Sequence, residues 1–153
     1  MGKYFVMSMR FNKSNASDFG FISNDTDTAI NPSDSSVWIK VSLYDFGWGK
    51  ENGFYKAPLP NFDTLFELVL HSTDRDDMYG AAAVILEKFA DELLYQCEML
   101  MNDRYRKKEF KKLVELFNLK LPINRCSVSQ KKYDQIQNDY IRWKKVADMA
   151  IKL

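Results

Sequence analysis

The chain has 153 residues, of which 46% are hydrophobic and 28% are charged. This length predicts one domain whose core needs neither disulfides nor a metal for stability. The formal net charge of +1 argues against a strongly basic, general nucleic-acid binder. The aromatic content of 14% argues against a disordered chain.

Two features of the sequence bear on its compartment. It contains no run of 18 apolar residues, so we expect no membrane-spanning helix. The first ten residues lack the long apolar region of a secretory signal. Cys97 and Cys126 lie in different predicted contexts, a helix and a loop. We therefore expect free thiols and a cytoplasmic protein.

Alternating hydrophobicity predicts strands in the first third of the chain. Residues 3–11 fit one strand, because every second side chain from Phe5 to Phe11 is apolar. Residues 12–36 are rich in Asn, Ser, Asp and Thr and predict a loop with one short strand. Residues 37–46 alternate again and predict a second strand.

The pattern then changes from strands to helices. Gly47, Gly49 and Gly53 are interpreted as turn residues. From Asn61 onward the apolar residues follow a helical period, and Asn61 is the predicted N-cap of a helix over 62–71.

Capping and breaking signals divide the rest of the chain. Thr73–Asp76 resembles a capping box that starts the next helix, and a kink is expected near Ala90. The small residues Gly80–Ala83 are explained by a close approach of two helices. A further helix is predicted over 104–119.

The last predicted helix starts at Ser127 or Ser129 and runs to about Ala150. The fold class is therefore α+β: a small N-terminal antiparallel sheet followed by four or five antiparallel-packed helices. We expect a single domain, with a β-rich part over 1–60 and a helical part over 61–153.

The sequence offers no strong catalytic motif, and we predict no catalytic residue, cofactor or metal. His71 is the only histidine and closes a predicted helix, where imidazole complements the dipole. Asp25 and Asp27 lie in a polar loop, but Ile30 and Ser36 stand where a calcium loop needs Gly and Glu. One His and two separated Cys give no zinc ligand set.

Charge is unevenly distributed along the chain. Residues 1–60 have a net charge of 0, residues 61–103 of −8, and residues 104–153 of +9. These segments either pair with each other inside the protein or present one acidic and one basic surface to partners.

An aromatic cluster over 38–55 and the acidic start of the second helix are the candidate binding features. Aromatic side chains in turns are enriched at protein interfaces. The predicted partner-binding residues are Asp74, Asp76, Asp77, Trp48 and Tyr55.

One stretch resembles a known class of proteins. The segment from Leu65 to Glu87, with Tyr79-Gly-Ala-Ala82 after an acidic start, and then Phe89–Leu94, is similar to HEAT-like helical hairpins of small bacterial proteins. Immunity proteins encoded beside secreted toxins are among them. The resemblance covers about 30 residues and implies a cytosolic protein that neutralises a toxin enzyme through charge complementarity.

Three hypotheses of function follow from these observations. The first is a non-enzymatic, immunity-type protein that binds a basic toxin domain and occludes its active site. Under this hypothesis nucleic acid and membrane are not partners. The alternative is a nucleic-acid-binding or regulatory module that uses the basic C-terminal helices, above all residues 104–112. The third is an enzyme with a dispersed site, which requires a deep polar pocket.

Overall fold

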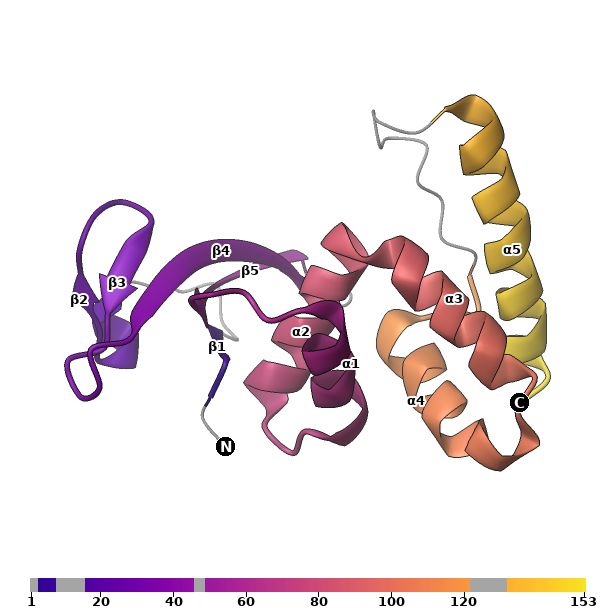
Figure 1. Ribbon diagram of the computed structural model, residues 1–153, viewed down its shortest axis with the longest axis horizontal. Coiled ribbons are helices and arrows are strands. Elements are labelled where there is room, and N and C mark those ends of the chain that lie inside the picture. Colours follow the sequence, from indigo (N-terminus) through magenta and orange to yellow (C-terminus); the bar gives the residue numbers. More distant parts are fainter. Residues whose placement is uncertain (1–2, 8–15, 46–48, 122–131) are drawn as a thin grey trace. The chain divides into compact units, whose positions relative to one another are not determined.

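The computed structural model describes residues 3–7, 16–45, 49–121 and 132–153 (Figure 1). The chain divides into two compact units, Met1–Phe89 and Ala90–Leu153. We call them the sheet unit and the helical unit and describe each by itself. The boundary lies after the second long helix, so the first two helices belong to the unit that contains the strands.

The sheet unit contains one five-stranded antiparallel sheet with the order β1-β5-β4-β3-β2. A short 3-10 turn, η1, lies between β1 and β2. The strands and the turn are β1 (Phe5–Met7), η1 (Ala16–Phe19), β2 (Ile22–Ser23), β3 (Thr28–Ile30), β4 (Val37–Asp45) and β5 (Gly49–Lys56).

Five α-helices follow in the described residues, which confirms the predicted α+β class. The sheet unit contains α1 (Phe62–His71) and α2 (Arg75–Lys88), and the helical unit contains α3 (Ala90–Met101), the 3-10 turn η2 (Arg104–Arg106), α4 (Lys107–Phe117) and α5 (Tyr133–Ile151). No helix in the described ranges is long and apolar enough to cross a membrane.

The strand predicted over 37–46 corresponds to β4, and the one predicted over 3–11 contains the shorter β1, with residues 8–11, 46 and 47 outside the described residues. The turn predicted at Gly49 and Gly53 is wrong. Gly49 and Gly53 lie in a strand rather than in a turn. Gly53 is paired with Met7 on one side and with Val41 on the other. Hydrogen bonding to two neighbouring strands outweighs the low strand propensity of glycine. The local sequence alone does not reveal this pairing.

The segment over 12–36 contains more structure than the single short strand that its polar composition predicts. Within its described part, η1, β2 and β3 surround Phe21, which is stacked on Trp38 with 4.9 Å between the ring centroids. Phe54 meets Phe21 edge-on at 5.9 Å. These rings form the core on one sheet face together with Val6, Ala29, Ala16 and Phe19. Trp38 is thus a core residue at 4% exposure.

The opposite sheet face packs on α2, and the absence of a side chain at Gly80 makes room for the ring of Phe5. A Cβ atom at Gly80 would lie 2.4 Å from Cγ of Phe5. The small patch over 80–83 therefore makes room for a ring from β1, and the predicted helix–helix approach does not explain this glycine. Phe5 is fully buried there.

The ends of α1 and the start of α2 agree with the sequence to within one residue, whereas the predicted helix over 104–119 starts as the 3-10 turn η2 and becomes α4 only at Lys107, and α5 starts at Tyr133. Asn61 caps α1 by accepting from the Thr64 N–H, as predicted. The N-cap of α2 is Asp74 rather than Thr73, because the Asp74 carboxylate accepts from the Asp77 N–H. The kink expected near Ala90 is a break between helices at Phe89. The candidate helix starts Ser127 and Ser129 lie outside the described residues.

The helical unit packs three helices around one core. Leu93, Leu94 and Cys97 of α3 are fully buried, as are Phe110 and Leu113 of α4. Helix α5 adds Trp143, Val146, Ala147 and Ala150, which all lie in its second half.

Candidate functional site

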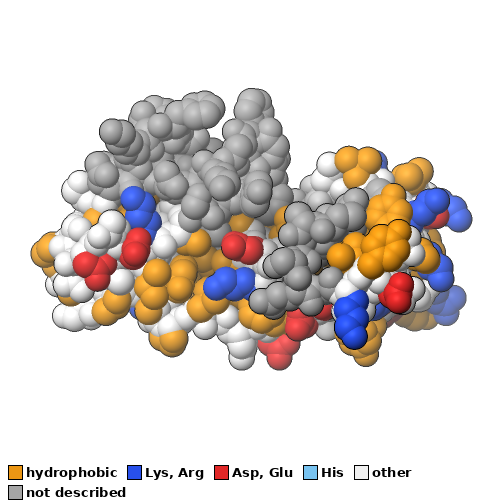
Figure 2. Space-filling view, turned by 90° about the horizontal axis from the view of Figure 1, so that it is seen from above, with side chains coloured by type: hydrophobic (Ala, Val, Ile, Leu, Met, Phe, Trp, Pro, Cys, Tyr) orange, Lys and Arg blue, Asp and Glu red, His pale blue; other side chains and the backbone are white. Residues whose placement is uncertain are grey.

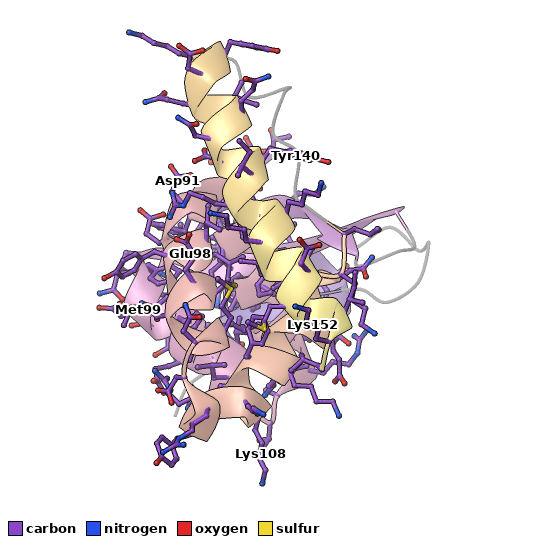
Figure 3. All side chains as sticks on the ribbon, turned by 90° about the vertical axis from the view of Figure 1, so that its right-hand side faces the viewer. Asp91, Glu98, Met99, Lys108, Tyr140 and Lys152 are labelled. Atoms are coloured by element: carbon purple, nitrogen blue, oxygen red, sulfur yellow. The ribbon has the colours of Figure 1, made fainter. Side chains whose placement is uncertain are left out.

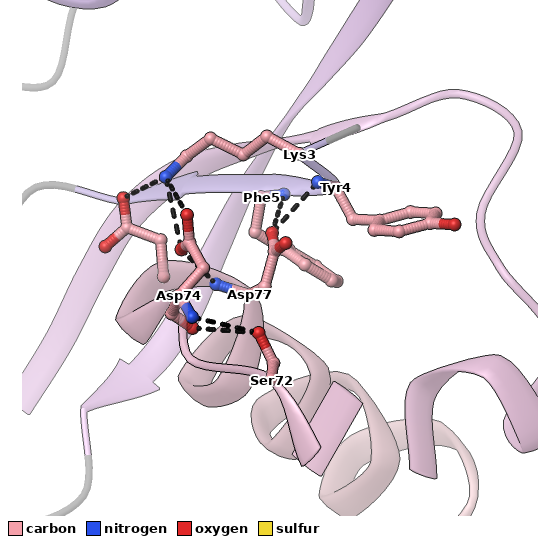
Figure 4. Close-up of polar contacts among 7 residues, drawn as sticks. Lys3, Tyr4, Phe5, Ser72, Asp74 and Asp77 are labelled. Carbon is pink, nitrogen blue, oxygen red and sulfur yellow. Dashed lines mark hydrogen bonds and ion pairs between the residues drawn. The ribbon is translucent and has the colours of Figure 1, made fainter. Parts of the chain in front are cut away.

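The acidic start of α2 forms a junction with β1 (Figure 4). Nζ of Lys3 donates to Asp74 at 2.9 Å and lies 3.3 Å from Oδ2 of Asp76. Oδ1 of Asp77 accepts the backbone N–H of Tyr4 at 2.9 Å and of Phe5 at 2.8 Å. These contacts join the first strand to the second helix.

Burial and hydrogen bonding act on these carboxyl groups in opposite directions. Burial raises the pKa of Asp77, although the Tyr4 and Phe5 N–H groups favour its ionised form. Partial burial works the same way on Asp74, but the Asp77 N–H and the Lys3 ammonium hold the pKa of Asp74 below its ordinary value. The pKa values of the two carboxyl groups are therefore shifted in opposite directions, and both groups accept hydrogen bonds within the sheet unit.

The four described residues of the five predicted to bind a partner, Asp74, Asp76, Asp77 and Tyr55, do not form one exposed surface. Asp77 is 5% exposed and its hydrogen bonds are internal. Tyr55 is half-buried in β5, opposite Phe5 and Ile39. Trp48 lies outside the described residues.

A different acidic surface lies on α3. Asp91, Glu92, Tyr95 and Met99 recur at helical spacing on its solvent side, and all four are exposed. We call them the α3 strip. Tyr95 is 58% and Met99 50% exposed, and Met99 lies on the side of α3 that faces away from α5 (Figure 3). Helix α3 contains no basic residue.

A charge pair beside the α3 strip fixes α3 to α5. Arg142 of α5 donates to both carboxylate oxygens of Glu98, with Nε 3.0 Å from Oε2. Hydrogen bonds from Arg142 hold the pKa of Glu98 below its ordinary value. These two hydrogen bonds hold α3, and with it the α3 strip, in a fixed position against α5.

A basic surface lies on η2 and α4. We use the name basic face for Arg104, Tyr105, Lys107, Lys108 and Lys111. All five side chains are exposed, and Tyr105, at 82%, is the most exposed large hydrophobic residue in the described chain. Figure 3 shows Lys108 at the lower end of the helical unit, whereas Figure 2 is seen from above and shows hydrophobic side chains gathered on the upper side of this unit.

Cys97 and His71 are residue types that can act as nucleophile, base or metal ligand, and Cys126 lies outside the described residues. Burial raises the pKa of the Cys97 thiol to about 12, so the thiolate is absent at neutral pH. His71 is the exposed last residue of α1, with Nε2 3.8 Å from Oε2 of Glu67. No group of three His, Cys, Asp or Glu in the described residues is placed to hold a metal ion.

Two pockets in the described part of the sheet unit have polar groups in their lining, one beside Lys3 and Lys56 and one beside β3. The pocket beside β3 has a volume of about 370 Å³ and is lined by Phe21, Lys40 and Phe54, with Asp25 at its side. The Asp25 carboxylate accepts the N–H groups of Asp27 and Thr28, each at 2.8 Å. Asp25 therefore stabilises the turn before β3, in agreement with its interpretation as a loop residue.

Tyr95 and Met99 were not identified as binding candidates from the sequence. The signal was present, because both are apolar and lie off the buried face formed by Leu93, Cys97 and Leu100. Comparison of the chain with protein-family models, curated proteins and solved structures finds no match.

Proposed function

We propose that this chain is a non-enzymatic protein-binding protein of the toxin-immunity type, and that the α3 strip covers a basic partner. The observation that carries the proposal is the exposure of Tyr95 and Met99 beside Asp91 and Glu92. Tyrosine and methionine are enriched at the centres of protein interfaces, and charged residues are typical of their rims.

Each part of the α3 strip has a physical task in this proposal. The Tyr95 ring and the Met99 thioether supply apolar area that loses water when a partner covers it. The carboxylates of Asp91 and Glu92 attract a basic surface and raise the association rate. Because the Glu98–Arg142 pair ties α3 to α5, little backbone ordering is needed on binding. A basic toxin domain covered in this way would have its active site occluded.

The test is co-expression of the chain with the product of the neighbouring gene. We expect a purified complex and rescue of cells from the toxicity of that product. The double variant Tyr95→Ala/Met99→Ala should weaken the complex at least about tenfold, as removal of hot-spot residues does. Isothermal titration gives the affinity, and thermal unfolding checks that the fold is retained.

Tyr133→Ala is the matched control, since Tyr133 is also an exposed tyrosine, at 71%, but lies on α5. It should leave the affinity unchanged. If the chain forms no complex and gives no rescue, the proposal is wrong. Equal weakening by Tyr133→Ala and by the α3 variant would remove the α3 strip as the interface.

Charge gives a second, independent test. Glu92→Lys should lower the association rate several-fold at low salt and less at high salt, since exposed charges act through screened, long-range attraction. Glu115→Lys, at an exposed position of α4, makes the same change in net charge away from the α3 strip. An equal effect of both variants would show that net charge alone controls the rate.

A further inference from the structure

We propose that the basic face of η2 and α4 binds single-stranded nucleic acid, with its cations on phosphates and Tyr105 stacked on a base. This inference does not depend on the α3 strip, and it departs from the expectation of the immunity-type hypothesis that nucleic acid is not a partner. It rests on the pairing of the cations, on the setting of Tyr105 and on the position of the charges along α4.

The lysines of the basic face lack acidic partners in the described residues. No ion pair or hydrogen bond involves the ammonium groups of Lys107, Lys108 and Lys111 within the described ranges. Glu115 lies one turn beyond Lys111 on the same side of α4, yet it makes no salt bridge with Lys111. Arg106, by contrast, is paired with Glu109. The charges of these three lysines are therefore not neutralised by acidic side chains of the described residues and can bind an anionic ligand.

Tyr105 stands on the surface in a defined position. Its backbone N–H donates to Oδ1 of Asp103 at 2.9 Å, which fixes the turn. Nη2 of Arg104 donates to the Tyr105 hydroxyl at 2.8 Å, and Cζ of Arg104 lies 4.9 Å from the ring centroid. An exposed aromatic ring beside a guanidinium is the arrangement on which unpaired bases stack.

The position of the charges is unfavourable for the isolated chain. Lys107 and Lys108 are the first two residues of α4, and Arg104 precedes them in η2. The start of a helix carries a partial positive charge and prefers acids. The only acidic residue in the first turn, Glu109, is paired with Arg106. A bound polyanion would relieve this repulsion.

The geometry favours a single strand over a duplex or an acidic protein. From Arg104 to Lys111 a helical rise of 1.5 Å per residue gives a length of about 10 Å, the span of two or three nucleotides. The bases of a duplex are already stacked and offer Tyr105 no face, whereas those of a single strand are free to stack.

The probe for the test is a fluorescein-labelled 20-nucleotide single-stranded DNA of random sequence, titrated with the full chain between 50 and 200 mM salt by fluorescence anisotropy. The logarithm of the affinity should fall with the logarithm of salt concentration with a slope of about −0.7 per phosphate contact, so about −2 for the roughly three phosphates that this length of strand carries. Lys108→Ala/Lys111→Ala should make the slope less negative by about 1.4, because two of these contacts are removed.

Tyr105→Ala should weaken binding about 5- to 100-fold and leave the salt slope unchanged, because it removes stacking and no charge. The double variant Lys144→Ala/Lys145→Ala, at exposed positions of α5, is the matched control and should leave both affinity and slope unchanged. Thermal unfolding of every variant should show the wild-type transition.

Two competitors complete the experiment, namely a duplex of the same sequence and polyglutamate. We expect the unlabelled single strand to displace the probe at much lower concentration than either. Displacement by polyglutamate at the same charge concentration would overturn the proposal in favour of an acidic protein ligand. Wild-type affinity of the Tyr105→Ala variant, or a flat response to salt, would also contradict it.

Discussion

The acidic start of α2 in the sheet unit and the exposed charges of α3 and α4 in the helical unit have different surroundings. In the sheet unit, Asp74, Asp76 and Asp77 bind the amino group of Lys3 or the backbone of β1. In the helical unit, Glu92 of α3 and Lys108 of α4 remain on the surface. The difference shows that an acidic cluster in the sequence has no fixed meaning: its role depends on which backbone groups the fold places beside it.

The backbone beside Asp77 is an edge strand. Among the described strands β1 is at the end of the order and pairs with β5 alone, so no described strand offers an acceptor to its outer N–H groups. Asp77 supplies that acceptor for Phe5. Buried N–H groups need a partner, which explains why the Asp77 carboxylate is internal, whereas Glu92 is exposed.

Removing the Asp77 side chain should have the largest effect. Asp77→Ala leaves the N–H groups of Tyr4 and Phe5 without their acceptor, and should lower the free energy of unfolding by about 2–5 kcal/mol. Asp77→Asn keeps an acceptor oxygen and should cost clearly less. Urea unfolding measures both, with Glu92→Ala as an exposed control. A large loss for Glu92→Ala would contradict the difference between the units.

The next largest effect is expected where α2 meets the sheet. Gly80→Ala places a Cβ atom 2.4 Å from Cγ of the buried Phe5 ring, and should cost about 1–3 kcal/mol through overpacking. The cost of Gly80→Ala should be smaller in a Phe5→Ala background, because that variant removes Cγ and Cδ1, the two atoms nearest the new Cβ. Additive costs in this double-mutant cycle would show that Gly80 and Phe5 do not interact.

The sequence predicted those elements whose local signals and packing agree. The helix over 62–71 combines Asn61 as N-cap with an apolar face, and the strand over 37–45 has a clear alternation. Gly49 and Gly53 were assigned to a turn because glycine punctuates a chain locally. Their place in β5 depends on pairing with β1 and β4, which single-residue propensity does not contain.

The candidate site was less predictable for the same reason. The acidic residues 74, 76 and 77 stand close together in sequence, which made them a plausible surface, but their partners Lys3, Tyr4 and Phe5 lie about 70 residues away. The α3 strip needs only the helical period to be found. Interpreting it as a surface also required the observation that no other element of the described chain buries Tyr95 or Met99.

The contribution of the Glu98–Arg142 pair to stability should depend on pH, which gives a test of a paired charge in the helical unit. The folded protein holds the pKa of Glu98 below the ordinary 4.5, so its contribution to stability is present above that value and is lost as pH falls through the lowered pKa. Glu98→Gln should therefore cost about 0.5–1 kcal/mol near pH 7. The difference from wild type should shrink toward zero as pH falls below 4.5. Denaturant unfolding at several pH values measures it, and a difference that grows in acid would reverse the assigned sign.

The smallest effect is expected for Lys3, although it has ion pairs with two carboxylates. Its side chain is 40% exposed and Asp74 is 39% exposed, so solvent and salt screen the attraction. Lys3→Ala should lower the free energy of unfolding by about 0.2–1 kcal/mol, and by less in 1 M salt. The junction between β1 and α2 would then depend chiefly on the buried hydrogen bonds to Asp77. A loss of stability for Lys3→Ala as large as that for Asp77→Ala would mean that the ion pairs of Lys3 hold β1 on α2. The degree of burial would then not distinguish charged residues that stabilise the fold from charged residues that can bind a partner.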